Sequence, residues 1–139
     1  MEQASLEGAA AIAYIAPEQV ARRVRESFGA TRVQHAIGSH FRVGDEETRV
    51  IAYPQSIEEL SEMLKLAHAE GWCVVPAGAG TWLEMGNRVV RFHLIVSTAQ
   101  MQRVIEYEPA DLTCTVEAGV SLCEFNARAG VQADWHEKK

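Results

Sequence analysis

Two short apolar runs joined by a capped helical segment constrain the fold of this chain more than any other feature. The runs cover residues 50–53 and 72–76. Between them, Ser56 and Glu59 have the spacing of a capping box, and Gly71 supplies a helix stop. Short runs connected through a helix favour two buried, parallel strands of a βαβ unit with a right-handed crossover. The apolar stripe of the predicted helix comprises Ile57, Leu60, Met63, Leu64 and Ala67.

The segments on either side of this unit extend it. Residues 17–28 have apolar side chains at every fourth position, which predicts an amphipathic helix, and residues 30–47 read as a polar connection. Residues 94–96 are a candidate third strand of the same sheet. We therefore divide the chain into an N-terminal helix with its connection, residues 1–47, and a main domain, residues 48–139.

The pattern changes after residue 103. Residues 104–107 and 113–117 alternate between apolar and polar side chains around a five-residue connection, which predicts an antiparallel hairpin. Ser121 and Glu124 then repeat the capping-box spacing at the start of a short helix. The predicted fold class is α/β (α+β), with a small parallel βαβ sheet and flanking helices followed by an antiparallel hairpin.

The charge balance limits the partners. Thirteen Lys and Arg against nineteen Asp and Glu give a formal net charge of -6, which argues against a basic groove for nucleic acid or anionic lipid. No apolar run approaches the roughly 18–20 residues of a membrane span. Acidic Glu2 and Glu7 stand where a secretory signal carries basic residues. We therefore expect a cytoplasmic protein without direct membrane insertion. The three cysteines, expected to be reduced and mostly buried, are Cys73, Cys114 and Cys123.

A loop of small residues at the carboxyl end of the second strand is the strongest candidate for a binding site. Ligands of open α/β sheets bind outside the carboxyl ends of strands. Gly78 and Gly80 permit positive φ, so successive backbone N–H groups can converge on an anion, and Thr81 adds a hydroxyl. Such a neutral loop can hold a diphosphate, although a plain tight turn would use the same residues. The candidate cofactor-binding residues are Pro76, Ala77, Gly78, Ala79, Gly80 and Thr81.

Other candidates have a weaker basis. The loop is neither the dinucleotide fingerprint of nicotinamide enzymes nor a P-loop, because the required third glycine and a Gly-Lys-Ser or Gly-Lys-Thr sequence are missing. Trp82 either stacks on an adenine or packs under the loop. The five histidines lack paired spacing, so no metal site is predicted. The polar positions that we expect to face solvent near the hairpin, rather than to form an acid–base pair, are Ser97, Thr98, Glu106, Glu108 and Asp111.

The segments 52–60, 74–81, 97–101, 104–107, 109–112 and 116–120, in this order and with the helix through Ala67 to Gly71 after the first of them, resemble the FAD-binding domain of the vanillyl-alcohol oxidase and p-cresol methylhydroxylase (PCMH-type) superfamily. More narrowly, they resemble the FAD-domain subunit of bacterial glycolate oxidase. The resemblance implies two subdomains with FAD extended between them, and a diphosphate held by the small-residue loop that Pro76 positions. It also implies a flavoprotein oxidoreductase that transfers a hydride from a small 2-hydroxy acid to flavin.

The chain departs from this family pattern in two ways. Ala77 and Ala79 stand where the family often has Arg and Gly, and His93 stands where Asp is common. No second glycine-rich stretch or substrate domain follows before Lys139. We therefore expect a truncated domain with an incomplete second subdomain, inactive by itself, in which no catalytic residue can be assigned. The expected partners are FAD and either other subunits of an oxidase complex or a second copy. The alternative function is a non-catalytic module for oligomerisation or subunit interaction.

Overall fold

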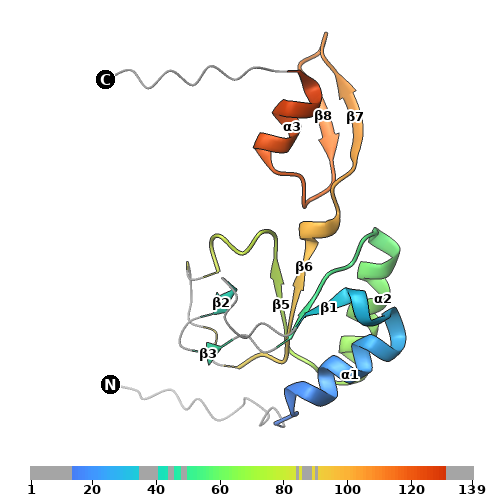
Figure 1. Ribbon diagram of the computed structural model, residues 1–139, viewed down its shortest axis with the longest axis vertical. Helices are drawn as coiled ribbons and strands as arrows, with labels where there is room; N and C mark the ends of the chain where they lie inside the picture. Colours follow the sequence, from blue (N-terminus) through green and yellow to red (C-terminus); the bar gives the residue numbers. More distant parts are fainter. Residues whose placement is uncertain are drawn as a thin grey trace, which may run out of the picture.

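A four-stranded mixed sheet forms the centre of the structure (Figure 1). The computed structural model describes residues 14–34, 41–43, 46–47, 50–83, 85, 89 and 91–130. In order of pairing, the strands are β1 (Val33–Gln34), β4 (Ile51–Ala52), β6 (Leu94–Ser97) and β5 (Val74–Ala77). β1 is antiparallel to β4, whereas β6 is parallel to both β4 and β5. The parallel strands confirm the predicted α/β sheet.

The third strand of the unit, β6, lies between the two strands that the sequence pattern indicates. Ile95 of β6 pairs with Ile51 on one side and with Val75 on the other. β6 is therefore buried along its whole length, as expected for a central parallel strand. β5 lies at the edge of the described sheet and is half-buried or exposed, so the prediction of a buried strand there is wrong. The edge position accommodates Pro76, which has no N–H to donate to a further strand.

Helices α1 (Pro17–Phe28) and α2 (Ile57–Ala69) pack on one face of the sheet. Pro17 occupies the first turn of α1, where its missing N–H costs no intrahelical bond. Ser56 begins α2 by accepting a hydrogen bond from the Glu59 N–H at 3.2 Å, and Gly71, with φ at +68°, follows its end. The buried residues of this core are Val20, Ala21, Val24, Val33, Val50, Ala52, Met63, Ala67, Trp72, Leu94 and Val96.

The buried stripe of α2 is narrower than predicted. Met63 and Ala67 are buried and Leu60 packs against the core, but Ile57 is 63% exposed and Leu64 is 46% exposed. Residues seven positions apart lie along nearly one line on a helix. Ile57 and Leu64 therefore lie on the same edge of the apolar stripe, where they are exposed. The prediction that both are buried is wrong.

A second apolar cluster covers the opposite face of the sheet. Side chains alternate along a strand, so Ile51 and Ile95 point away from the helices. They pack in a cluster with Phe41, which precedes β2 (Arg42–Val43), a strand that pairs antiparallel with β3 (Glu46–Glu47). Ala77 extends the cluster toward the carboxyl end of β5. The loop after β5 therefore begins at a residue that packs against this second apolar cluster.

Residues before position 48 belong to the same sheet and core as the residues after it. Beyond the pairing of β1 with β4, the short helix η1 (Ala30–Arg32) is tied to α2 by an ion pair. Two guanidinium nitrogens of Arg32 lie 3.0 Å from the two carboxylate oxygens of Glu59. Arg32 and the Gln55 N–H lower the pKa of the Glu59 carboxyl. The division of the chain near residue 48 stays a prediction.

Beyond β6 the chain leaves the sheet through η2 (Thr98–Gln100) and forms a hairpin with a helix packed on it (Figure 1). Strands β7 (Val104–Glu108) and β8 (Thr113–Val116) are antiparallel, as predicted, with a connection one residue shorter than expected. The predicted capping box of Ser121 and Glu124 begins α3 (Leu122–Ala129). The Tyr107 and Phe125 rings meet edge to face, with centroids 5.5 Å apart.

The hairpin and α3 bury few side chains, which corrects one expectation about the cysteines. All three cysteines are free thiols, but Cys114 and Cys123 are exposed and Cys73 is half-buried. The prediction of buried thiols is therefore wrong for the two that lie on β8 and α3, because each of these elements is covered on one side only. Within the ranges that the structure describes, no helix is long and apolar enough to cross a membrane.

Candidate functional site

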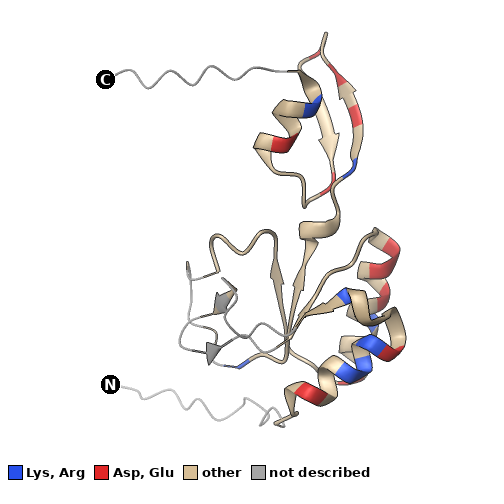
Figure 2. Ribbon diagram, viewed as in Figure 1, with Lys and Arg blue, Asp and Glu red and all other residues tan. Residues whose placement is uncertain are grey.

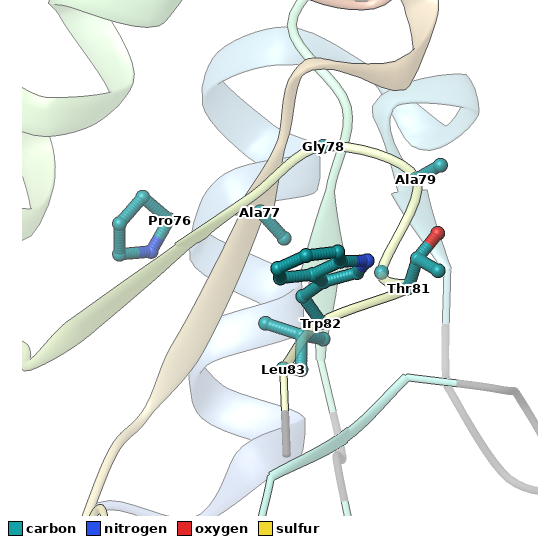
Figure 3. Close-up of a pocket in the computed structure, with 8 residues that line it drawn as sticks. Pro76, Ala77, Gly78, Ala79, Thr81, Trp82 and Leu83 are labelled. Atoms are coloured by element: carbon teal, nitrogen blue, oxygen red, sulfur yellow. The ribbon is translucent and has the colours of Figure 1, made fainter. Parts of the chain in front are cut away.

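The loop that follows β5 brings all six predicted binding residues together (Figure 3). β5 ends at Ala77, and the chain then curves through Gly78 and Ala79 and turns back to Leu83. Residues 76–83 line a cavity of about 310 Å³. The loop lies at the carboxyl end of the parallel strands, the end at which β6 continues toward the hairpin (Figure 1). This is the position at which open α/β sheets bind ligands.

The lining of this cavity is uncharged. None of residues 76–83 is acidic or basic, whereas acidic residues lie on α2, the hairpin and α3 (Figure 2). The polar groups of the lining are main-chain groups, the Thr81 hydroxyl and the Trp82 indole N–H. An anion in this cavity would be held by neutral donors and would meet no carboxylate of the lining.

The two glycines of the loop are used differently. Gly80 has φ at +84°, which L side chains rarely adopt. Gly78 does not have a positive φ, and a Cβ built on it meets no described atom within 4 Å. The fold thus requires glycine at position 80 but not at position 78. The space beside Gly78 is available to a ligand that approaches the main chain closely.

Two hydroxyl side chains, at the last residue of β6 and the first residue of η2, support the loop, contrary to the prediction that they face solvent. Ser97 is fully buried, and its Oγ donates a hydrogen bond to the Gly78 carbonyl at 2.7 Å. Thr98 Oγ1 lies 3.4 Å from the Ala77 carbonyl and 3.4 Å from the Ala118 carbonyl. Both residues come directly after the apolar run 94–96, at the same edge of the sheet as the loop. Their position at the carboxyl end of a predicted strand could have indicated from the sequence that they lie beside the loop.

The remaining polar positions near the hairpin agree with the prediction. Glu106, Glu108 and Asp111 are exposed. Their side chains are therefore not arranged around the loop cavity, whose lining is confined to residues 76–83.

Trp82 and His93 lie in different surroundings. Trp82 lines the cavity and is 75% exposed, so it does not pack under the loop, and its ring face is accessible for stacking. His93 precedes β6 at the opposite end of the strand, where its Nδ1 accepts a hydrogen bond from the Cys73 N–H at 2.9 Å. The replacement of the family's Asp by His93 therefore does not alter the lining of the loop cavity.

Metal-ligating side chains and the cavity beside α3 are the remaining candidates for a site. In the described part of the chain, no group of three or more His, Cys, Asp or Glu side chains is placed to hold a metal ion. A second cavity, of about 230 Å³, lies between the hairpin and α3 and is lined by Val104, Tyr107, Phe125, Arg128 and Ala129.

Comparisons with known proteins identify the family. The family model described as "FAD binding domain" matches residues 48–135. The chain is 32% identical over 78 residues to "Probable D-lactate dehydrogenase, mitochondrial" of Danio rerio, a match that spans 56% of this chain and 16% of that protein. It is 33% identical over 72 residues to D-2-hydroxyglutarate dehydrogenase of Xanthomonas citri pv. viticola, spanning 52% and 15%. Its structure is similar to that of p-cresol methylhydroxylase with substrate bound, with a TM-score of 0.66, 14% identity, and coverage of 82% of this chain and 25% of that chain.

The chain therefore belongs to the FAD binding domain family, because the family model covers more than half of it. The predicted PCMH-type fold is confirmed by the structural similarity to p-cresol methylhydroxylase, and the cofactor of the family is FAD. The residues present fit this cofactor, since the uncharged loop and the open space at Gly78 suit a diphosphate. The match spans about one sixth of the length of the Danio rerio relative.

Proposed function

We propose that residues 76–81 hold the diphosphate of FAD, and that the chain thereby supplies the cofactor-holding part of an oxidoreductase that acts on a small 2-hydroxy acid. Lactate and 2-hydroxyglutarate, named in the relatives, are both 2-hydroxy carboxylates. Glycolate is a smaller member of the same chemical class, so an enzyme of glycolate oxidase type is included in the proposal. The protein's contribution is to bind and orient the cofactor, and FAD, when bound, supplies the acceptor for a hydride.

The observation that carries this proposal is the environment of Gly78. Neither its backbone φ nor any atom of the described residues requires glycine there, so this part of the fold gives no reason for the missing side chain. A ligand held by main-chain groups does give a reason, because a side chain would keep it at a distance. The Thr81 hydroxyl and the exposed Trp82 indole line the same cavity and add donors beside the main chain.

The experiment is a calorimetric titration of FAD and, separately, of ADP, which carries the diphosphate without the flavin. Gly78→Ala and Gly78→Val form a graded series in side-chain volume. We expect unfolding free energy to be unchanged or raised by about 0.4–1 kcal/mol in Gly78→Ala, since the backbone there is compatible with alanine. We expect the affinity for both ligands to fall in Gly78→Ala and to fall about tenfold or more in Gly78→Val, a loss of about 1.4 kcal/mol of binding free energy.

The control is Ala110→Val, which adds volume at an exposed position in the hairpin turn, outside the cavity lining. This variant should bind both ligands as the unaltered chain does. Equal ligand affinity in the Gly78 series and in the unaltered chain would contradict a diphosphate site at this loop. Binding of FAD without binding of ADP would indicate that the chain contacts the flavin half of the cofactor and not its diphosphate.

A second candidate function is a non-catalytic interaction module. The observation that favours it is apolar surface on the hairpin and α3, where Ile105 is 64%, Leu112 92% and Leu122 66% exposed. A contiguous exposed apolar patch is typical of a surface that another chain covers, and these side chains would contribute to such a patch. Light scattering distinguishes the two functions, because a dimer that ignores FAD supports the module and a monomer that binds FAD supports the cofactor site.

The inactivity of the chain by itself and its cytosolic location are also proposals. Inactivity is proposed because the resemblance places the substrate-binding groups of the family outside the FAD binding domain that residues 48–135 match. Free thiols on exposed positions suit a reducing compartment, which supports the cytosol. The Danio rerio relative is named as mitochondrial, so the compartment is best tested by fractionating cells that express the tagged chain.

A further inference from the structure

The polar side chain of Ser97 is buried, so its hydroxyl needs hydrogen-bond partners within the protein. Ser97 is the last residue of β6 and its exposed fraction is 0%. Its hydroxyl donates to the Gly78 carbonyl at 2.7 Å and accepts from the Ala99 N–H at 3.3 Å. A buried hydroxyl without partners would be destabilising, so these two bonds account for its presence in the core.

The bond to Gly78 extends the sheet beyond its last ladder pair. Ala77 and Ser97 are the final partners in the register of β5 and β6, and Gly78 is the first residue of the loop. Its carbonyl therefore has no strand partner in the register and is held by a side chain of the neighbouring strand instead. The hydroxyl thus determines the orientation of the first peptide unit after the strand.

We propose that Ser97 is a positioning residue of the diphosphate loop, an inference that rests on the proposed function. In a trans peptide unit the C=O and the N–H point in opposite directions. Drawing the Gly78 carbonyl toward β6 turns the negative end of that peptide dipole inward and its positive end away from the sheet. An anion beside the loop is then spared the repulsion of a carbonyl oxygen. Ser97 acts through Gly78, because it does not itself line the cavity.

The test compares three variants in the full chain. Ser97→Ala removes the donor, and Ser97→Cys keeps a side chain of similar shape with a weaker donor. Val24→Ala is the stability control, because Val24 is a buried residue of α1 in the core on the helix face. We expect ADP affinity to fall roughly threefold to tenfold in Ser97→Ala and by less in Ser97→Cys, the change that loss of one hydrogen bond produces. Val24→Ala should lower the melting temperature and leave ADP affinity unchanged.

A second measurement needs no ligand. NMR order parameters of the backbone N–H groups at Gly78 and Ala79 should fall in Ser97→Ala and stay unchanged in Val24→Ala. Unchanged order parameters and chemical shifts in this loop would overturn the inference whether or not ADP binds. If the unaltered chain fails to bind ADP, the proposed function fails, and the order parameters alone then decide whether Ser97 positions the loop. Equal ADP affinity in the unaltered chain and in Ser97→Ala would also overturn the inference.

Discussion

At the scale of single residues, close backbone approaches decide where a side chain is tolerated. Gly119 follows the hairpin and lies against η2, where its N–H donates to the Met101 carbonyl at 2.9 Å. A Cβ built at this position would lie 2.7 Å from the same carbonyl oxygen and would collide with the Thr98 carbonyl. Gly119 is therefore required by packing, whereas Gly78 is not.

We predict that Gly119→Ala lowers the unfolding free energy by about 1–3 kcal/mol, the usual range for forcing extra atoms into a packed site. The backbone atoms that it meets cannot rotate away as a side chain would. Chemical denaturation measures the change, and Gly78→Ala is the matched control because its added methyl group meets open space. Equal stability of the two variants would contradict the packing that we describe at the junction between sheet and hairpin.

At the scale of elements, the turn of the hairpin contains an unfavourable backbone conformation. The bulge in β7 falls between Val104 and Glu106, and the connection to β8 contains Leu112, which has φ at +56° and is 92% exposed. A leucine in the left-handed region costs energy because its Cβ crowds the carbonyl oxygen. No burial of this side chain compensates for that cost, so the turn is held less well than a turn with asparagine or glycine would be.

Leu112→Asn is therefore expected to raise the unfolding free energy by about 0.5–1 kcal/mol, because asparagine tolerates the left-handed region better than leucine does. Denaturant titration of the variant and of the unaltered chain measures the gain. Leu122→Asn removes another exposed leucine, but from a helical position, and should give no such gain. An equal effect of both substitutions would mean that exposure, not backbone conformation, is responsible.

At the scale of the whole molecule, glutamate carboxylates form hydrogen bonds and ion pairs that join neighbouring elements or cap a helix. Glu59 joins η1 to α2, Glu117 joins the two ends of the hairpin through Arg103, and Glu124 caps α3. Arg103 lies 2.7 Å from the Glu117 carboxylate, and this side-chain bond, with the Arg103 N–H, lowers the pKa of Glu117. The pKa of Glu59 is lowered by Arg32, and that of Glu124 by Ser121. Each carboxyl is thus easier to ionise in the folded chain than in the unfolded chain.

The sign of the pH dependence follows from these directions. A carboxyl whose pKa is lower when folded stabilises the protein above its unfolded pKa, near the ordinary value of 4.5, and loses that contribution as the pH falls through the folded pKa. We predict that the melting temperature falls as the pH is lowered from about 7 to about 3. In Glu117→Gln the melting temperature should start lower at neutral pH and fall less steeply, whereas exposed Glu106→Gln should follow the unaltered chain. A parallel curve for Glu117→Gln would exclude this residue as a source of the acid sensitivity.

Local patterns of the sequence determined the helices, the hairpin and the small-residue loop. Capping boxes, apolar spacing and glycine stops involve residues within a few positions of one another, so they can be recognised along the chain. The loop at 76–81 was predicted for the same reason, since a strand end followed by alternating small residues is a local feature. The family resemblance then connected that loop with FAD.

Only the tertiary structure decided which surfaces meet. The insertion of β6 between β4 and β5, and with it the edge position of β5, depends on pairing between segments far apart in the chain. The same pairing buries Ser97 behind the loop. The packing of α3 on the separate hairpin leaves Cys114 and Cys123 exposed. Burial and close approach are properties of the assembled elements. The sequence alone does not show whether a serine hydroxyl will form its hydrogen bond with water or with a carbonyl.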